Sequence, residues 1–359
     1  MKVTPSAAVL TVFLALTAPV VGQQPTQTVR LQRPTIWSPT DLAVSMITGT
    51  AVCDSASDVY LRLAKSNEAV VQAPFRIMGP SGQSIEVEPA ATLPERLIIT
   101  AFGVDPDGNL YATLQLGRSP QWYIVSYDQN AKLTGKVALS EDLTPFFIIP
   151  LKDHRTLVGG VRPLKSATDK HVSSLIALFD SKGKVLRSLS LPDDDEDEEV
   201  TKVEYGNGTY YSVSNRAVER GRAVRGGDGM FYIFRASSSP KVQVIDVDGN
   251  TQRVLSLDPP ANGVWPTNFY LLGDSIAIGY FESKQENVCL TEGNFTLYDR
   301  MSGNLTANFT VPLSPDVFLC AQHQSLIYLR AAKASQTYQW SHIDIPTVEH
   351  VSAAIPHSQ

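Results

Sequence analysis

Residues 103–114 read GVDPDGNLYATL, and this short stretch predicts the fold. Asp and Gly are typical turn residues, because Gly accepts the positive φ angles that tight hairpin turns require. The hydrophobic run around Tyr111 is typical of a β-strand. We therefore expect DPDG to be a hairpin turn and Tyr111 to pack within a sheet.

The same strand, polar turn and strand return along the chain. Four close copies and one weaker copy read IVSYDQNAKLTGKVAL (124–139), LIALFDSKGKVLRSLSL (175–191), VQVIDVDGNTQRVLSL (242–257), FTLYDRMSGNLTANFTV (295–311) and FRIMGPSGQSIEVEP (75–89). Further hairpins precede such units at 45–64, 97–116, 146–161, 268–281 and 316–332. Repeated four-stranded antiparallel units are typical of a β-propeller. The chain is therefore predicted to be all-β and six-bladed, with modules at 45–90, 97–140, 145–191, 215–257, 266–311 and 314–345.

The last module shows only three strands, which suggests how the ring closes. A strand at residues 28–34, TVRLQRP, can supply the missing one from the opposite end of the chain. Residues 201–213 leave the blade number open, because they read either as an extra hairpin or as part of a seventh blade. A pair of β-sandwiches is the alternative fold, although it does not explain the even period.

AFGVDPDGNLYATL resembles the core of an NHL-type repeat, with a weaker copy at RGGDGMFYIFRA (225–236). It is more loosely similar to the six-bladed lactonase and gluconolactonase propellers. That resemblance implies a divalent metal held by inward-pointing carboxylate and Asn side chains. The predicted inner strands FFIIPLK and VFLCAQ are apolar where those ligands are expected, so the activity is not carried over.

Composition and the N-terminus indicate an exported domain. Residues 1–22 have the pattern of a secretory signal, followed by a propeller at 23–347 and a tail at 348–359; an uncleaved anchor is the alternative. The formal net charge of −6 argues against nucleic-acid binding, and no later stretch could span a membrane. A secreted or periplasmic monomer is expected.

Three cysteines, Cys53, Cys289 and Cys320, leave at least one thiol free. Buried apolar thiols are favoured over a disulfide, and any pairing is left open. The six histidines are scattered, and His154 is expected in a turn. The nucleophile motif GxSxG and the nucleotide-binding motifs are absent, so no catalytic residue is predicted. The use of four Asn-x-Ser/Thr sequons, at Asn207, Asn294, Asn304 and Asn308, is undecided.

An acidic run, Asp193–Glu199, follows a predicted outer strand. Asp193, Asp195 and Asp197 could bind Ca²⁺, because hard cations prefer several carboxylate oxygens. The run is unbroken and lacks a glycine, so a solvated loop is the favoured interpretation. No other cofactor is predicted.

Candidate ligand-binding residues lie near the same predicted loops. Arg216 and Arg220 could hold an anionic ligand or pair with the acidic run, while Trp122, beside Arg118, and Trp265 could stack on a sugar or proline or pack between blades. We expect a binding module for a protein, peptide or glycan. The alternatives are a divalent-metal-dependent, lactonase-like hydrolase or lyase and a structural role in a larger assembly.

Overall fold

The computed structural model describes residues 27–30, 43–44, 51–53, 59–64, 76–78, 84–86, 97–116, 119, 121–162, 174–189, 200–205, 208–213, 223–235, 239–261, 264–282, 292–312, 317–322, 324–332 and 337–345. All the regular secondary structure in these residues is β-strand, as expected for an all-β chain. None of these residues forms a helix long and apolar enough to cross a membrane. The signal segment at 1–22 and the tail at 348–359 lie outside the described residues.

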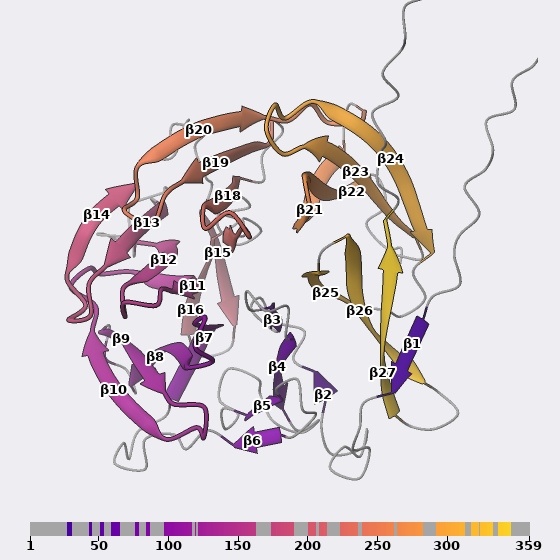
Figure 1. Ribbon diagram of the computed structural model, residues 1–359. Coiled ribbons are helices and arrows are strands. Elements are labelled where there is room, and N and C mark those ends of the chain that lie inside the picture. Colours follow the sequence, from indigo (N-terminus) through magenta and orange to yellow (C-terminus); the bar gives the residue numbers. More distant parts are fainter. Residues whose placement is uncertain are drawn as a thin grey trace, which may run out of the picture.

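The sheets follow one another in chain order around a ring (Figure 1). The first contains β2 (Ala43–Val44), β3 (Ala51–Cys53), β4 (Val59–Ala64), β5 (Arg76–Met78) and β6 (Ser84–Glu86). The second contains β7 (Leu97–Val104), β8 (Leu110–Leu116), β9 (Trp122–Tyr127) and β10 (Leu133–Ala138). The third contains β11 (Thr144–Pro150), β12 (Thr156–Val161), β13 (Ser174–Phe179) and β14 (Val185–Leu189).

Three further sheets complete the ring. The fourth contains β17 (Ala223–Arg225), β18 (Phe231–Arg235), β19 (Lys241–Ile245) and β20 (Thr251–Ser256). The fifth contains β21 (Val264–Leu272), β22 (Ser275–Glu282), β23 (Glu292–Asp299) and β24 (Leu305–Pro312). The sixth contains β25 (Val317–Gln322), β26 (Ser325–Ala332), β27 (Thr337–Asp344) and β1 (Gln27–Arg30). This arrangement is a β-propeller, as the repeated hairpins predicted.

The N-terminal strand closes the last sheet, as the sequence predicted. β1 pairs antiparallel with β27, from Gln27 opposite His342 to Arg30 opposite Gln339. The described strand ends at Arg30, whereas the sequence suggested residues 28–34. Hydrogen bonds between the two ends of the chain therefore close the ring.

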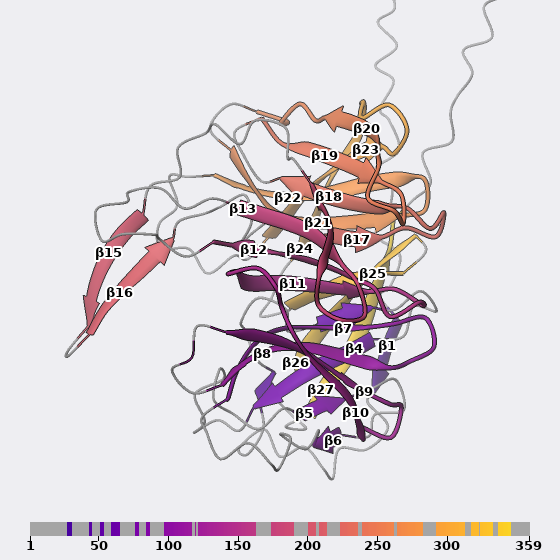
Figure 2. The ribbon, with the colours of Figure 1, turned by 90° about the vertical axis from the view of Figure 1, so that its left-hand side faces the viewer.

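A hairpin, β15 (Val200–Tyr205) and β16 (Gly208–Val213), pairs only with itself within the described part of the chain. Seen along the ring axis it lies inside the outline of the ring, and Figure 2 shows it standing clear of the ring on one side. In sequence it lies between the third and fourth sheets, at the residues 201–213 that left the blade number open.

The core lies between neighbouring sheets. Hydrophobic clusters of the described residues join the first sheet to the second and so on, in chain order, as far as the sixth. In β13, Leu175, Ala177 and Phe179 pack toward the second sheet, while Ile176 and Leu178 pack toward the fourth. A strand buried on both faces needs apolar side chains at every position, which explains the unbroken run LIALF. Tyr111 is 4% exposed and packs in the cluster between the second and third sheets, as expected.

One expectation about cysteine was wrong. Cys53, at the end of β3, is disulfide-bonded rather than a free buried thiol. β3 of the first sheet and β25 of the last sheet lie against each other. Closing the ring therefore brings together strands whose cysteines are far apart in the sequence.

Candidate binding face

The two faces of the ring differ in the length of their connections. Successive connections in an antiparallel sheet leave from opposite edges in alternation, so every second connection of each sheet lies on the same face of the ring, which we call the turn face. Its connections are short, and those bounded by described strands span residues 54–58, 79–83, 105–109, 128–132, 151–155, 180–184, 226–230, 246–250, 273–274, 300–304 and 323–324. The opposite loop face has connections as short as 313–316 and 333–336, but it also has all the long ones, among them 65–75, 162–173, 283–291 and the segment between β14 and β17 with its hairpin. Long connections are where binding residues usually lie.

The aspartates of the turn face stabilise its turns. In four of the five-residue turns, an Asp at the first position accepts hydrogen bonds through Oδ1 from the backbone N–H groups two and four residues later. The bonds are 2.8–2.9 Å long and belong to Asp105, Asp128, Asp180 and Asp246. These carboxylates complete their own turns, so the DPDG motif is structural.

The fourth position of these turns has positive φ throughout the described examples. It is occupied by Gly108, Ala131, His154, Gly183, Gly229, Gly249 and Gly303. Glycine reaches this region without steric cost, which explains the repeated D-x-x-G pattern. His154 has φ 64° and accepts the same position, so it is a turn residue as expected. Its Nδ1 lies 2.9 Å from the hydroxyl of Tyr111, which comes from the neighbouring sheet.

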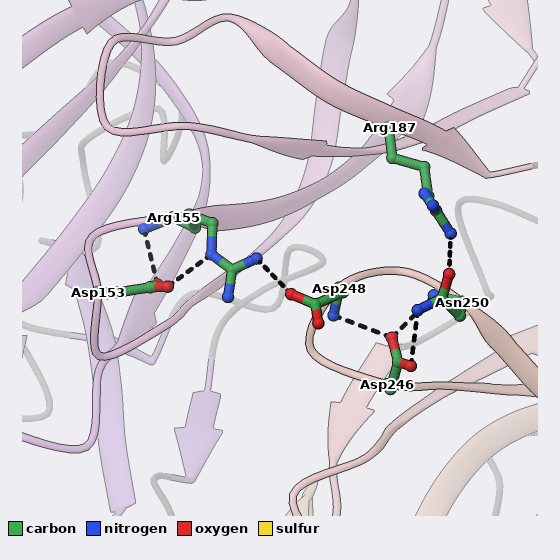
Figure 3. A network of polar contacts seen from close by, with 6 residues as sticks. All are labelled: Asp153, Arg155, Arg187, Asp246, Asp248 and Asn250. Atoms are coloured by element: carbon green, nitrogen blue, oxygen red, sulfur yellow. Dashed lines mark hydrogen bonds and ion pairs between the residues drawn. The ribbon is translucent and has the colours of Figure 1, made fainter.

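An ion pair and a hydrogen bond on the turn face connect the third sheet to the fourth (Figure 3). The Arg155 guanidinium lies 2.6 Å from Asp153 in its own turn and 3.0 Å from Asp248 in the β19–β20 turn. Asp248 donates its backbone N–H to Asp246, and Arg187 donates to the side-chain oxygen of Asn250. These contacts hold the third and fourth sheets together. Arg155, Asp153 and Asp248 are therefore paired with one another within the protein.

A second cluster lies between the fourth and fifth sheets. The Tyr232 hydroxyl donates to Asp228 Oδ2 at 2.7 Å and accepts from Arg253 Nη2 at 3.3 Å. The Arg300 guanidinium lies 5.7 Å from the centre of the Tyr232 ring. Burial, followed by the hydrogen bond to Asp228, raises the pKa of Tyr232 to about 12. The phenol therefore stays protonated at neutral pH and acts as a hydrogen-bond donor.

On the loop face, a polar side chain just before β9 links the two ends of the β9–β10 hairpin. Gln121 Nε2 donates to the backbone oxygens of Trp122 and Leu139, each at 2.8 Å. Arg162 and Glu141 form an ion pair at 3.4 Å between the end of β12 and the connection that precedes β11. The sequence pattern gave no signal for the Gln121–Leu139 and Arg162–Glu141 contacts, because each joins residues from separate strands or connections.

The structure describes only two of the predicted site residues, Trp122 and Trp265. Trp122 is 5% exposed and packs in the cluster between the second and third sheets, so its ring offers little surface for stacking. Trp265 lies in β21 opposite Phe281. The remaining candidates lie outside the described residues: Arg118, Arg216, Arg220, Asp193, Asp195 and Asp197. Ligand binding by these residues stays a prediction.

Among the residues that the structure describes, no three His, Cys, Asp or Glu side chains come together as a group that could hold a metal ion. The acidic run, the Ca²⁺ candidate, lies outside these residues.

The turn aspartates predict a specific acid dependence of stability. Burial raises the pKa of Asp246, but hydrogen bonds from Asn250, Asp248 and Gln252 outweigh it and leave the pKa below its ordinary value. Asp246→Ala should therefore lower the free energy of unfolding by about 1–2 kcal/mol at pH 7. A lowered folded-state pKa stabilises the fold above the unfolded pKa of about 3.9, so this loss should shrink as the pH falls through the folded-state value. Denaturant unfolding of the wild type and the variant at pH 7 and pH 3 measures the loss of stability and its decrease at low pH.

Asp248→Ala is the matched control in the same turn. Its side chain is 67% exposed and its main partner is Arg155, so the cost should be below about 1 kcal/mol. Equal losses for the two variants would contradict the assigned role of Asp246.

No protein-family model matches this chain, and no curated protein matches its sequence. Solved structures with a similar arrangement include polysaccharide lyase Uly1, at 11% identity and TM-score 0.46, covering 86% of this chain and 78% of that one. Another is the β-propeller domain of Cps50 (Swd1) from Myceliophteria thermophila, at 9% identity and TM-score 0.45, covering 86% and 100%. Virginiamycin B lyase from Staphylococcus aureus matches at 11% identity and TM-score 0.41, covering 89% and 99%. With TM-scores this low, none of these activities is transferred to this chain.

Proposed function

We propose that this protein is an exported, monomeric β-propeller that binds a protein, peptide or glycan through its loop face. The contrast between the faces is the observation that supports it. Turn-face connections are short, and many of their charged groups bond to one another. The loop face has the long connections and the projecting β15–β16 hairpin (Figure 2).

We further propose six blades of NHL-like type, with β15–β16 as an insertion. Export rests on the signal-like residues 1–22, and the disulfide at Cys53 agrees with an oxidising compartment. Arg118, Arg216, Arg220 and Trp265 are the proposed ligand contacts, because the sequence places them in or beside loop-face connections.

A binding screen with a deletion variant tests the loop face. The labelled mature protein would be applied to glycan and peptide arrays, and the dissociation constant of any hit measured by calorimetry. Replacing residues 200–213 with a short Gly-Ser linker should weaken that binding at least tenfold. Asp248→Ala, on the turn face, should leave it unchanged. Unchanged binding after the deletion, or a loss in Asp248→Ala, would contradict the proposal.

The alternative, a divalent-metal-dependent lactonase-like hydrolase or lyase, makes a different prediction. Such an enzyme would retain a stoichiometric metal ion after purification without chelator, and EDTA would lower its melting temperature. That result, together with turnover of lactones or sugar acids, would replace the binding module as the proposed function.

A further inference from the structure

The disulfide at Cys53 has two possible partners within the chain, Cys289 and Cys320. Cys53 is the last residue of β3 and pairs with Val59 across the first hairpin. It therefore lies toward the turn face, beside the β3–β4 turn of the first sheet.

The positions of the strands separate the two candidates. β25, which contains Cys320, lies against β3 on one side and β21 on the other. Cys320 pairs with Ile327 of β26, near the turn-face end of the last sheet. Cys289 lies outside the described residues, in sequence between β22 and β23 of the fifth sheet. In Figure 1 the strands of the fifth sheet are separated from those of the first sheet by the last sheet.

We propose that the bond joins Cys53 to Cys320 and covalently closes the propeller, leaving Cys289 as a thiol. The ring would then be closed twice. β1 joins β27 by hydrogen bonds in the outer part of the last sheet, and the disulfide joins β3 to β25 in the inner part. Both links connect the two ends of the chain, and neither depends on the ligand of the loop face.

The chemistry is an ordinary thiol oxidation. Two thiols lose two protons and two electrons as the S–S bond forms, and the disulfide of an exchange catalyst or of oxidised glutathione accepts the electrons and becomes two thiols. An exported protein meets such oxidants after leaving the cytosol.

Peptide mapping tests the pairing directly. The mature protein would be alkylated without reduction, digested with trypsin and analysed by mass spectrometry. Cleavage after Arg300 places Cys289 and Cys320 in different peptides. We expect one cross-linked pair that contains Cys53 and Cys320, and a single alkylated thiol at Cys289. A Cys53–Cys289 pair, three alkylated cysteines or a link between two chains would overturn the proposal.

Melting temperatures give a second, independent measurement. Cys53→Ser, Cys320→Ser and the double variant should each melt about 4–10 °C below the oxidised wild type and close to the reduced wild type. The double variant should lose no more than either single one, because all three break the same bond. Cys289→Ser should melt like the wild type. A loss in Cys289→Ser with none in Cys320→Ser would assign the bond to Cys289 instead.

Discussion

Gly183→Ala is expected to lower the free energy of unfolding by about 3 kcal/mol, from two separate causes. Gly183 has φ +77°, which costs an L-residue about 1–2 kcal/mol. A Cβ at this position would also overlap the backbone oxygen of Ala138 and lie 2.7 Å from Val137 Cγ1, both in the neighbouring sheet. The backbone oxygen of Gly183 accepts a 2.9 Å hydrogen bond from the backbone N–H of Ser140. The turn therefore cannot move away from the neighbouring segment without losing this bond.

Gly229 provides the matched control. It occupies the same turn position with φ +80°, but a Cβ there would meet no atom within 4 Å. Gly229→Ala should therefore cost only about 1 kcal/mol, the backbone part of the effect. Denaturant unfolding of the two variants measures the difference. Equal costs would show that close packing of turn against sheet does not add to stability at Gly183.

Much of the fold could be predicted from local patterns. The turn DVDGN and its flanking alternation predicted a hairpin at 242–257, and the structure has β19 and β20 there. The prediction succeeded because the Asp246 carboxylate and Gly249 satisfy the turn within a few residues. Even the closing strand could be inferred, because the last module was one strand short.

Contacts between sheets could not be predicted in this way. Arg155 and Asp248 are far apart in the sequence, and each turn alone gives no signal that the other is adjacent. The disulfide at Cys53 was missed for the same reason, because only the closed ring brings β3 against β25. Trp122 shows why binding sites are harder to predict than strands. From the sequence, an aromatic residue beside a loop can be a ligand contact or a core residue, and only the burial of Trp122 in the structure distinguishes the two.

The largest effect is expected where two sheets share their core. Phe234 and Phe269 stack with ring centroids 5.0 Å apart and an interplanar angle of 6°. They come from the fourth and fifth sheets and are 1% and 0% exposed. Phe269→Ala would leave a cavity at this interface and remove the stack, so the free energy of unfolding should fall by about 3–5 kcal/mol. Guanidinium unfolding followed by tryptophan fluorescence measures it.

Two further variants separate the cavity from a general loss of hydrophobicity. Phe269→Leu keeps much of the volume and should cost clearly less than Phe269→Ala. Leu186→Ala removes a side chain that is 52% exposed on the outer strand of the third sheet, and it should change stability by less than about 0.5 kcal/mol. If Phe269→Ala cost no more than Leu186→Ala, the interface between the fourth and fifth sheets would not contribute to the measured stability. A large loss with an unchanged m-value would instead show that this interface stays closed until the ring unfolds as one unit.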